Sequence, residues 1–194
     1  SAHTCTGERA ARLVPIIKAV LGESIGSGGS TLRDYVRADG EIASIAAVDR
    51  DVEASTSGAS LREGSRRHGG AFLASHARLG GDMAPRLRQA ILSGECLGHI
   101  VVMQGAVWQA IGLDEELLQL TSAYCAVSGA IAAAVRLGAI GALEGQKVLA
   151  ACLPLIEQLV AQPVAADAEL KSFLPFLDVA AARHARADLR LFAN

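Results

Sequence analysis

Residues 117–160 read LLQLTSAYCAVSGAIAAAVRLGAIGALEGQKVLAACLPLIEQLV, and they contain two apolar runs joined by a glycine-rich elbow. The first run, Leu117–Val135, has no charged residue and ends at Arg136. The second run, Val148–Val160, repeats apolar residues at the spacing of one helix face. These positions are Leu149, Cys152, Leu153, Ile156, Leu159 and Val160. We therefore expect two apolar helices at the centre of an all-helical core.

The elbow between the two runs begins with the residues of a helix end. Gly138 stands where a glycine commonly follows the last helical turn, because glycine adopts the left-handed conformation without a steric penalty. Arg136 lies in that last turn, where a cation faces the negative end of the helix dipole. The first helix should therefore stop near Gly138, and the second should follow after a short turn.

Composition places the chain among single-domain helical proteins. Of its 194 residues, 51% are apolar and only 4% are aromatic, so the core is built from Ala, Leu, Val and Ile. Such residues suit helices that pack closely, and the alternating patterns of strands are almost absent. We predict an all-α fold in which residues 1–194 form one domain, a helical bundle of about seven to ten helices.

Charge and cysteine content favour a cytoplasmic protein that does not bind nucleic acid. The net charge is −2, whereas a general nucleic-acid binder has a strongly basic surface. The four cysteines are scattered without paired spacing, and the N-terminus has no signal-peptide pattern. Cys125 and Cys152 lie inside the apolar runs, where we expect them to be small buried hydrophobic residues.

The first apolar run is long enough to be tested as a membrane span. Its residues are mostly Ala, Ser, Gly and Thr, Gln119 interrupts it, and three acidic residues, Asp114–Glu116, precede it as they would a soluble helix. We expect a buried core helix and no association with a membrane.

Other segments carry their own helix signals. Helices are expected at Glu8–Leu21, Ile42–Val52, Pro85–Leu92, Ile100–Ile111 and Asp178–Phe192. Another helix opens at Ser60, since Glu63 three residues later completes a capping-box pattern. This helix also carries the basic residues Arg62, Arg66, Arg67 and His68. That basic cluster is either a solvated face or a partner surface.

No constellation in the sequence has the pattern of an active site. Cys96 and His99 form a lone C-x-x-H pair, which supplies only half of a tetrahedral zinc site. No serine or cysteine stands in a nucleophile-elbow motif. We therefore expect no catalytic residue, no metal site and no cofactor, and we expect that the protein is not an enzyme.

The C-terminal segment carries a basic stripe followed by two apolar residues. Arg183, Arg186 and Arg190 recur on one helix face, with His184 beside them and Leu191-Phe192 at the end. Cations near a helix C-terminus complement its dipole by about 0.3–1 kcal/mol each. Arginines next to an exposed Leu-Phe pair are also typical of interface anchors. Both interpretations remain open on the residues alone.

Two segments of the second half of the chain resemble the urease accessory protein UreF family. The family's run A-A-x-R-L-G-x-x-G-Q-x-x-G-Q is matched here by Ala133, Ala134, Arg136, Leu137, Gly138, Gly141, Gly145 and Gln146. Its closing motif, L-D-I-x-x-x-x-H-E followed by R-L-F, is matched by Leu177, Asp178, His184, Arg190, Leu191 and Phe192. Taken together, the resemblance extends over roughly Ile42 to Asn194.

This resemblance implies an all-α, cytoplasmic accessory protein without enzymatic activity. The family acts as a chaperone of nickel insertion: with a UreG-like GTPase and a UreD/UreH-like scaffold, it takes part in delivering nickel cations to apo-urease. It commonly forms homodimers, and its C-terminal tail docks onto the scaffold. The implied partner-binding residues are Arg136, Gly138, Gly141, Gln146, Arg183, His184, Arg186, Arg190, Leu191 and Phe192.

The N-terminal segment, residues 1–41, is atypical of that family. Ala142 and Ala185 also replace residues that the family often has as Gln and Glu. The stretch Gly28–Glu41, GGSTLRDYVRADGE, is more similar to a segment of formamidopyrimidine-DNA glycosylases. Such an enzyme needs an N-terminal Pro-Glu and four paired zinc cysteines, which this sequence lacks. The alternative hypothesis is a glycosylase-derived fragment or a DNA-binding module.

Overall fold

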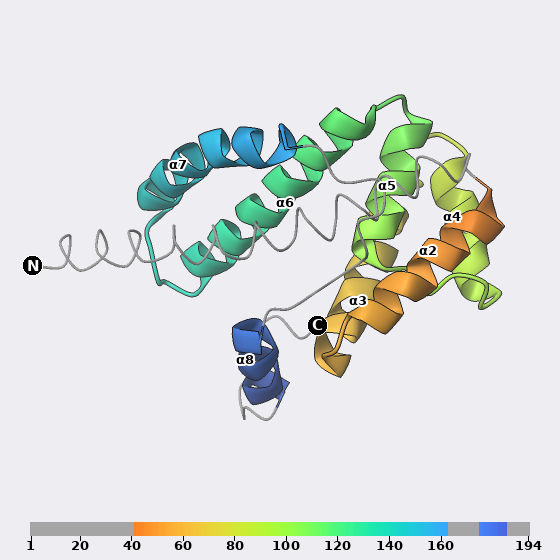
Figure 1. Cartoon of the computed structure of the whole chain (residues 1–194), viewed down its shortest axis with the longest axis horizontal. Helices are drawn as coiled ribbons and strands as arrows, with labels where there is room; N and C mark the ends of the chain where they lie inside the picture. Colours follow the sequence, from red (N-terminus) through yellow and green to blue (C-terminus); the bar gives the residue numbers. More distant parts are fainter. Residues whose placement is uncertain (1–40, 163–174, 186–194) are drawn as a thin grey trace, which may run out of the picture.

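The computed structural model of this chain describes residues 41–162 and 175–185, which form seven helices and no strand (Figure 1). The helices are α2 (Ile42–Ser55), α3 (Ala59–His76), α4 (Met83–Leu92), α5 (Ile100–Ala110), α6 (Glu115–Arg136), α7 (Ala142–Val160) and α8 (Pro175–Ala185). The all-α prediction is confirmed for this part of the chain. The helix expected at Glu8–Leu21 and the atypical segment 1–41, except Glu41, lie outside the described residues.

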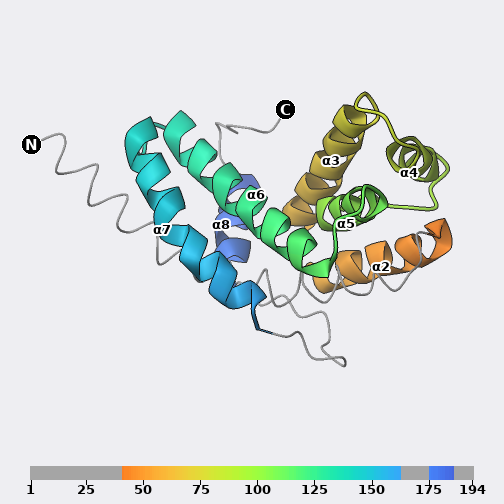
Figure 2. The same ribbon diagram turned by 90° about the horizontal axis from the view of Figure 1, so that it is seen from above.

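Helices α2–α5 pack together at one end of the molecule, and α6 and α7 form an antiparallel hairpin at the other (Figures 1 and 2). The first core contains buried residues of α2, α3, α4 and α5, among them Ile45, Leu73 and Met103. The second core joins α6 to α7 through residues such as Val127 and Cys152. Leu118, near the start of α6, belongs to the first core, so α6 links both.

Helix α6 begins and ends as its sequence predicts. The side chain of Asp114 accepts a hydrogen bond from the Leu117 backbone N–H at 2.9 Å, which caps the first turn. At the other end Gly138 has φ +65°, and the N–H groups of Gly138 and Ala139 donate to the carbonyls of Val135 and Ala134. These two bonds are those of a Schellman motif, and they stop the helix at the predicted glycine.

Only one face of α6 is buried, which corrects the expectation of a core helix throughout. Six of its 22 residues are buried, while Leu117 and Tyr124 are 49% and 45% exposed. Cys125 is exposed as well, so the prediction that it is buried was wrong, whereas Cys152 is fully buried. Helix α6 is long and apolar enough to cross a membrane, but length and composition do not distinguish a span from a core helix.

Helix α3 starts differently from the sequence-based expectation. It begins at Ala59 with Gly58 as its N-cap, and no side chain caps it. Ser60 therefore lies inside the first turn, and the predicted capping box does not form. Glu63 instead pairs with Arg67 one turn later, at 3.0 Å.

The close approach of α3 to the chain before α5 depends on Gly69. A Cβ atom added there would overlap the carbonyl oxygen of Gly98 and would lie 3.1 Å from the backbone nitrogen of Ile100. Both obstacles are backbone atoms, which cannot rotate away. Gly70, the next residue of the same helix, has no atom within 4 Å of the equivalent position.

We predict that Gly69→Ala lowers the free energy of unfolding by about 2 kcal/mol or more, because the methyl group forces two backbone segments apart. Gly70→Ala is the matched control, and it should raise that free energy by about 0.5–1 kcal/mol through better helix propensity. Urea unfolding followed by circular dichroism measures both. Equal effects of the two substitutions would contradict the close approach.

Candidate functional site

The elbow between α6 and α7 is a short turn, as the sequence predicts. Helix α7 starts at Ala142, with Gly141 as its N-cap, ahead of the apolar run that begins at Val148. Gly145 and Gln146 therefore belong to the first turn and a half of α7. The reason is packing: Gly145 is buried, and a Cβ there would come within 3.0 Å of Ile131, so the missing side chain lets α7 begin directly against α6.

An open pocket of about 310 Å³ lies at this end of the hairpin. It is lined by Ser128, Ile131, Ala132, Val135, Arg136, Ala142, Gln146 and Leu149. The structure thus brings two of the predicted partner-binding residues, Arg136 and Gln146, to one hollow between the helices. The other two elbow residues, Gly138 and Gly141, form the turn next to it and carry no side chain of their own.

Exposed apolar side chains also occur on the turn and on the helix that contribute to this pocket. Leu137 is 53% exposed and Leu143 is 68% exposed, and Leu153 farther along α7 is 41% exposed. A pocket with one guanidinium, one amide and adjoining apolar side chains suits a protein partner, since arginine and large apolar groups are typical of interface centres. We name the pocket, together with Leu137 and Leu143, the elbow surface.

The conformation of Gly138 offers a test of the elbow that does not depend on packing. No atom lies within 4 Å of the position where its Cβ would be, so a substitution there acts only through the left-handed backbone. We predict that Gly138→Ala destabilises the protein by about 1–2 kcal/mol. Gly129→Ala, at an equally open position inside α6, should instead stabilise it by up to about 1 kcal/mol. Thermal unfolding measures the contrast, and two shifts of the same sign would contradict it.

The predicted tail residues fall partly inside the described structure. Arg183 and His184 are exposed in the last turn of α8, whereas Arg186, Arg190, Leu191 and Phe192 lie outside the described residues. Helix α8 packs against α3 and not at the elbow (Figure 1). The structure therefore places the two predicted partner surfaces on different elements.

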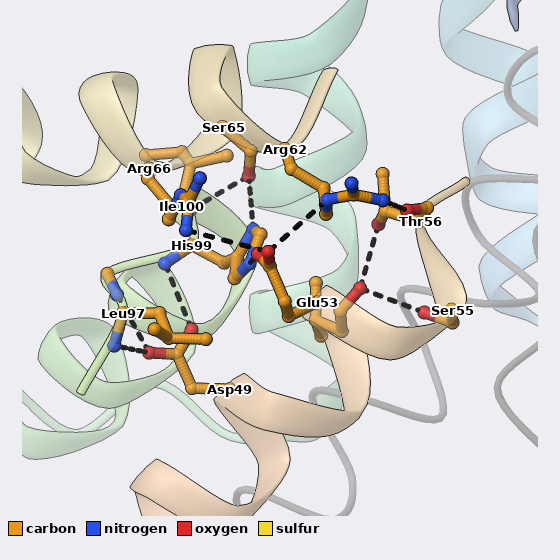
Figure 3. Close-up of polar contacts among 12 residues, drawn as sticks. Asp49, Glu53, Ser55, Thr56, Arg62, Ser65, Arg66, Leu97, His99 and Ile100 are labelled. Carbon is orange, nitrogen blue, oxygen red and sulfur yellow. Dashed lines mark hydrogen bonds and ion pairs between the residues drawn. The ribbon is translucent and has the colours of Figure 1, made fainter. Parts of the chain in front are cut away.

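A buried carboxylate organises the chain just before α5. Asp49 of α2 is fully buried, and it accepts hydrogen bonds from the backbone N–H groups of Leu97, Gly98 and His99 at 2.6, 2.7 and 3.0 Å (Figure 3). Residues entering a helix have N–H groups without helical partners, and a buried N–H left unpaired is costly. Asp49 therefore fixes the entry into α5.

The imidazole of His99 completes this arrangement. It is fully buried, with Nε2 at 2.7 Å from a Glu53 carboxylate oxygen and Nδ1 at 3.1 Å from the Ser65 hydroxyl (Figure 3). A ring protonated on Nε2 donates to Glu53 and accepts from Ser65, whose oxygen in turn accepts from the Ile100 N–H at 3.3 Å. Both ring nitrogens are engaged, so this histidine has no open position for a metal or a substrate.

Two arginines of α3 hold the other oxygen of Glu53. Arg62 Nε lies at 3.2 Å and Arg66 Nη1 at 3.5 Å from Glu53 Oε1. The same Arg62 donates through Nη1 to the carbonyls of Thr56 and Ser57 in the α2–α3 loop. Part of the predicted basic cluster is therefore structural, joining α2 to α3, and it is not a wholly solvated face.

Sequence reasoning did not identify Asp49 and Glu53 as members of this network. A signal was present, because both are acidic residues on the face of α2 that also carries Ile45, Val48 and Val52. Acidic residues on an apolar helix face need buried partners. Their partners come from α3 and from the chain before α5, which the sequence alone does not bring together.

The C-x-x-H pair does not form a zinc site. Cys96 is buried in a small cluster with Ala46 and Ala90, while both nitrogens of His99 are engaged elsewhere. Burial, together with the carboxylates of Asp49 and Glu95, raises the pKa of the Cys96 thiol to about 11, so it stays protonated at neutral pH. Within residues 41–162 and 175–185, no group of three metal-ligating side chains comes together.

We predict that Asp49→Asn lowers the free energy of unfolding by about 2 kcal/mol or more, because one amide oxygen replaces a carboxylate that serves three donors. Asp51→Asn is the matched control, since Asp51 is exposed on the same helix. It should change that free energy by less than about 0.5 kcal/mol. Chemical denaturation measures both, and an Asp49→Asn variant as stable as the control would contradict the role of the carboxylate.

The described fold and surface define an all-helical protein with an open elbow surface on a two-helix hairpin. The UreF family model matches residues 10–153, which include the whole elbow. The chain is 32% identical over 160 residues to the urease accessory protein UreF of Trichodesmium erythraeum, covering 80% of this chain and 68% of that protein. It is 30% identical over 150 residues to that of Mycobacterium sp. (strain JLS), covering 77% and 67%. The chain therefore belongs to the UreF family.

A short N-terminal stretch is also similar to formamidopyrimidine-DNA glycosylases. The match to the enzyme of Rhodospirillum centenum is 63% identical over 41 residues, or 21% of this chain and 14% of the enzyme. A match to the enzyme of Novosphingobium aromaticivorans is 73% identical over 30 residues and covers 11% of that enzyme. These matches agree with the resemblance noted for residues 28–41 and cover too little of an enzyme to indicate its activity.

Proposed function

We propose that this chain acts as a non-catalytic accessory protein in the maturation of urease. In this role it works with a UreG-like GTPase and a UreD/UreH-like scaffold in the insertion of nickel into apo-urease. The observation that supports the proposal most directly is the position of the elbow surface inside a chain of the UreF family. An accessory protein of this kind acts through contacts with partners, and the elbow offers such a contact.

The elbow surface has features of a protein-docking site. Arg136 and Gln146 line one hollow, where an arginine can pair with a partner carboxylate and an amide can both donate and accept hydrogen bonds. The exposed leucines of the adjoining turn and of α7 supply apolar area, which drives association. Polar groups beside apolar ones give a partner both affinity and a fixed register.

The tail supplies a second docking element in this proposal. Arg183 and His184 are exposed on α8, and the remaining tail residues follow them in sequence. We assign the tail to the scaffold partner, as the family resemblance implies. We also expect a cytoplasmic homodimer, and light scattering on the purified protein at several concentrations tests the dimer.

A capture experiment with purified UreD/UreH-like scaffold and UreG-like GTPase tests the elbow. We expect Arg136→Ala and Gln146→Ala each to weaken binding of at least one partner by about tenfold, the loss typical of a truncated interface anchor. Lys147→Ala is the matched control, because Lys147 is exposed on α7 but does not line the pocket. Surface plasmon resonance gives the affinities, and circular dichroism checks that each variant is folded.

Truncation before Arg183 tests the tail in the same assay. We expect the shortened chain to lose capture of the scaffold while the elbow residues stay intact. Unchanged capture by both the truncated chain and the Arg136→Ala variant would reject this function. Duplex DNA at physiological salt serves as the alternative ligand, since tight and steeply salt-dependent binding would favour the glycosylase-like hypothesis.

A further inference from the structure

A polar contact joins α8 to the α2–α3 loop. The hydroxyl of Ser57 donates to Asp178 Oδ2 at 3.0 Å, across 121 residues of sequence. Asp178 lies in the first turn of α8, and Ser57 comes two residues before α3 begins at Ala59. In Figure 1, α8 lies beside this start of α3.

The second carboxylate oxygen of Asp178 lies against Gly58. A Cβ atom at Gly58 would be 3.4 Å from Asp178 Oδ1, so a larger side chain there would meet the carboxylate. Gly58 is the N-cap of α3, and no side-chain hydrogen bond caps the start of that helix. The negative charge of Asp178 therefore lies at the positive end of the α3 dipole, which favours it.

The loop that receives Asp178 is held by the core. Arg62 donates to the carbonyls of Thr56 and Ser57 at 2.6 and 3.0 Å, and its Nε is paired with Glu53. Glu53 in turn contacts the buried His99 (Figure 3). A continuous set of polar contacts thus runs from the entry of α5 to the residue that Asp178 meets, so Ser57 has a fixed position.

We propose that Asp178 is a positioning residue that docks α8 on the α2–α3 loop and thereby sets where Arg183 and His184 of α8 are presented to the scaffold. This inference rests on the proposed function of the tail. Asp178 starts the helix and Arg183 lies five residues later, between one and two turns along it. Fixing the first turn of α8 therefore fixes the orientation of the helix that carries Arg183 and His184.

The hydrogen bond between Ser57 and Asp178 contributes only a small free energy to the docking of α8. Ser57 is exposed, and a hydrogen bond at such a site is individually weak, so its loss shifts α8 toward an undocked state by a modest factor. A partner that recognises docked α8 binds with an apparent affinity equal to its intrinsic affinity multiplied by the docked fraction of α8. Loss of the Ser57–Asp178 contact then weakens capture without removing any group that touches the scaffold.

Hydrogen exchange on the full-length chain alone tests the docking. We expect Asp178→Ala and Ser57→Ala each to speed exchange of the α8 amides by about three- to tenfold, the effect of one lost hydrogen bond. The double variant should be no faster than the single ones, because both remove the same contact. Ser60→Ala, an exposed serine one turn away on α3, is the matched control. Wild-type exchange in both Asp178→Ala and Ser57→Ala would overturn the proposal.

Affinity for the UreD/UreH-like scaffold separates positioning from direct contact. Positioning predicts that Ser57→Ala and Asp178→Ala both weaken scaffold binding by about two- to threefold, the factor by which the docked fraction of α8 falls. It also predicts recovery in the swapped variant Ser57→Asp/Asp178→Ser, which restores the hydrogen bond in the opposite direction. A loss seen only when Asp178 is changed, with no recovery in the swap, would overturn it. Failure of the wild-type chain to bind the scaffold would reject the proposed function instead, while the exchange result still decides the docking.

Discussion

The three hydrogen bonds that Asp49 accepts hold together the part of the molecule on which the rest is built. They bring the chain before α5 against α2, and that chain in turn passes so close to α3 that only glycine fits at position 69. A buried carboxylate is costly unless its oxygens are fully used, and here they satisfy the backbone donors of a helix entry. This constraint fixes where the entry of α5 meets α2 and α3, whose apolar side chains share one core.

The hairpin of α6 and α7 depends on that bundle in a different way. Helix α6 has 22 residues, which corresponds to a length of about 33 Å, and its Leu118 is buried among the residues of the bundle. Beyond Leu118, α6 packs mainly against α7 among the described helices. One face of α6 is therefore left uncovered by the described residues, which explains why an apolar helix has so many exposed positions.

Local patterns in the sequence correctly predicted the two ends of α6. Asp114 and Gly138 cap α6 as expected, because a cap needs only its own neighbouring residues. The exposure of Cys125 was not predicted, since it depends on which face of α6 the partner helix covers. Arg136 and Gln146 line the same pocket, because the family motif and the helix end fall on the same short stretch, and their role in partner binding stays a prediction. The network of Glu53 with His99 required residues 46 positions apart, and no local pattern carries that information.

The separation of the two candidate docking surfaces bears on how an accessory protein could serve two partners. The elbow lies at the far end of the hairpin, whereas α8 lies beside the start of α3 in the bundle (Figures 1 and 2). Two partners can then bind at once without competing for the same residues. Because α6 contributes residues to both cores, the elbow is connected to the bundle by a continuous helix and not by a loop. Separate surfaces joined by one continuous helix suit the proposed role, in which a GTPase and a scaffold are brought together.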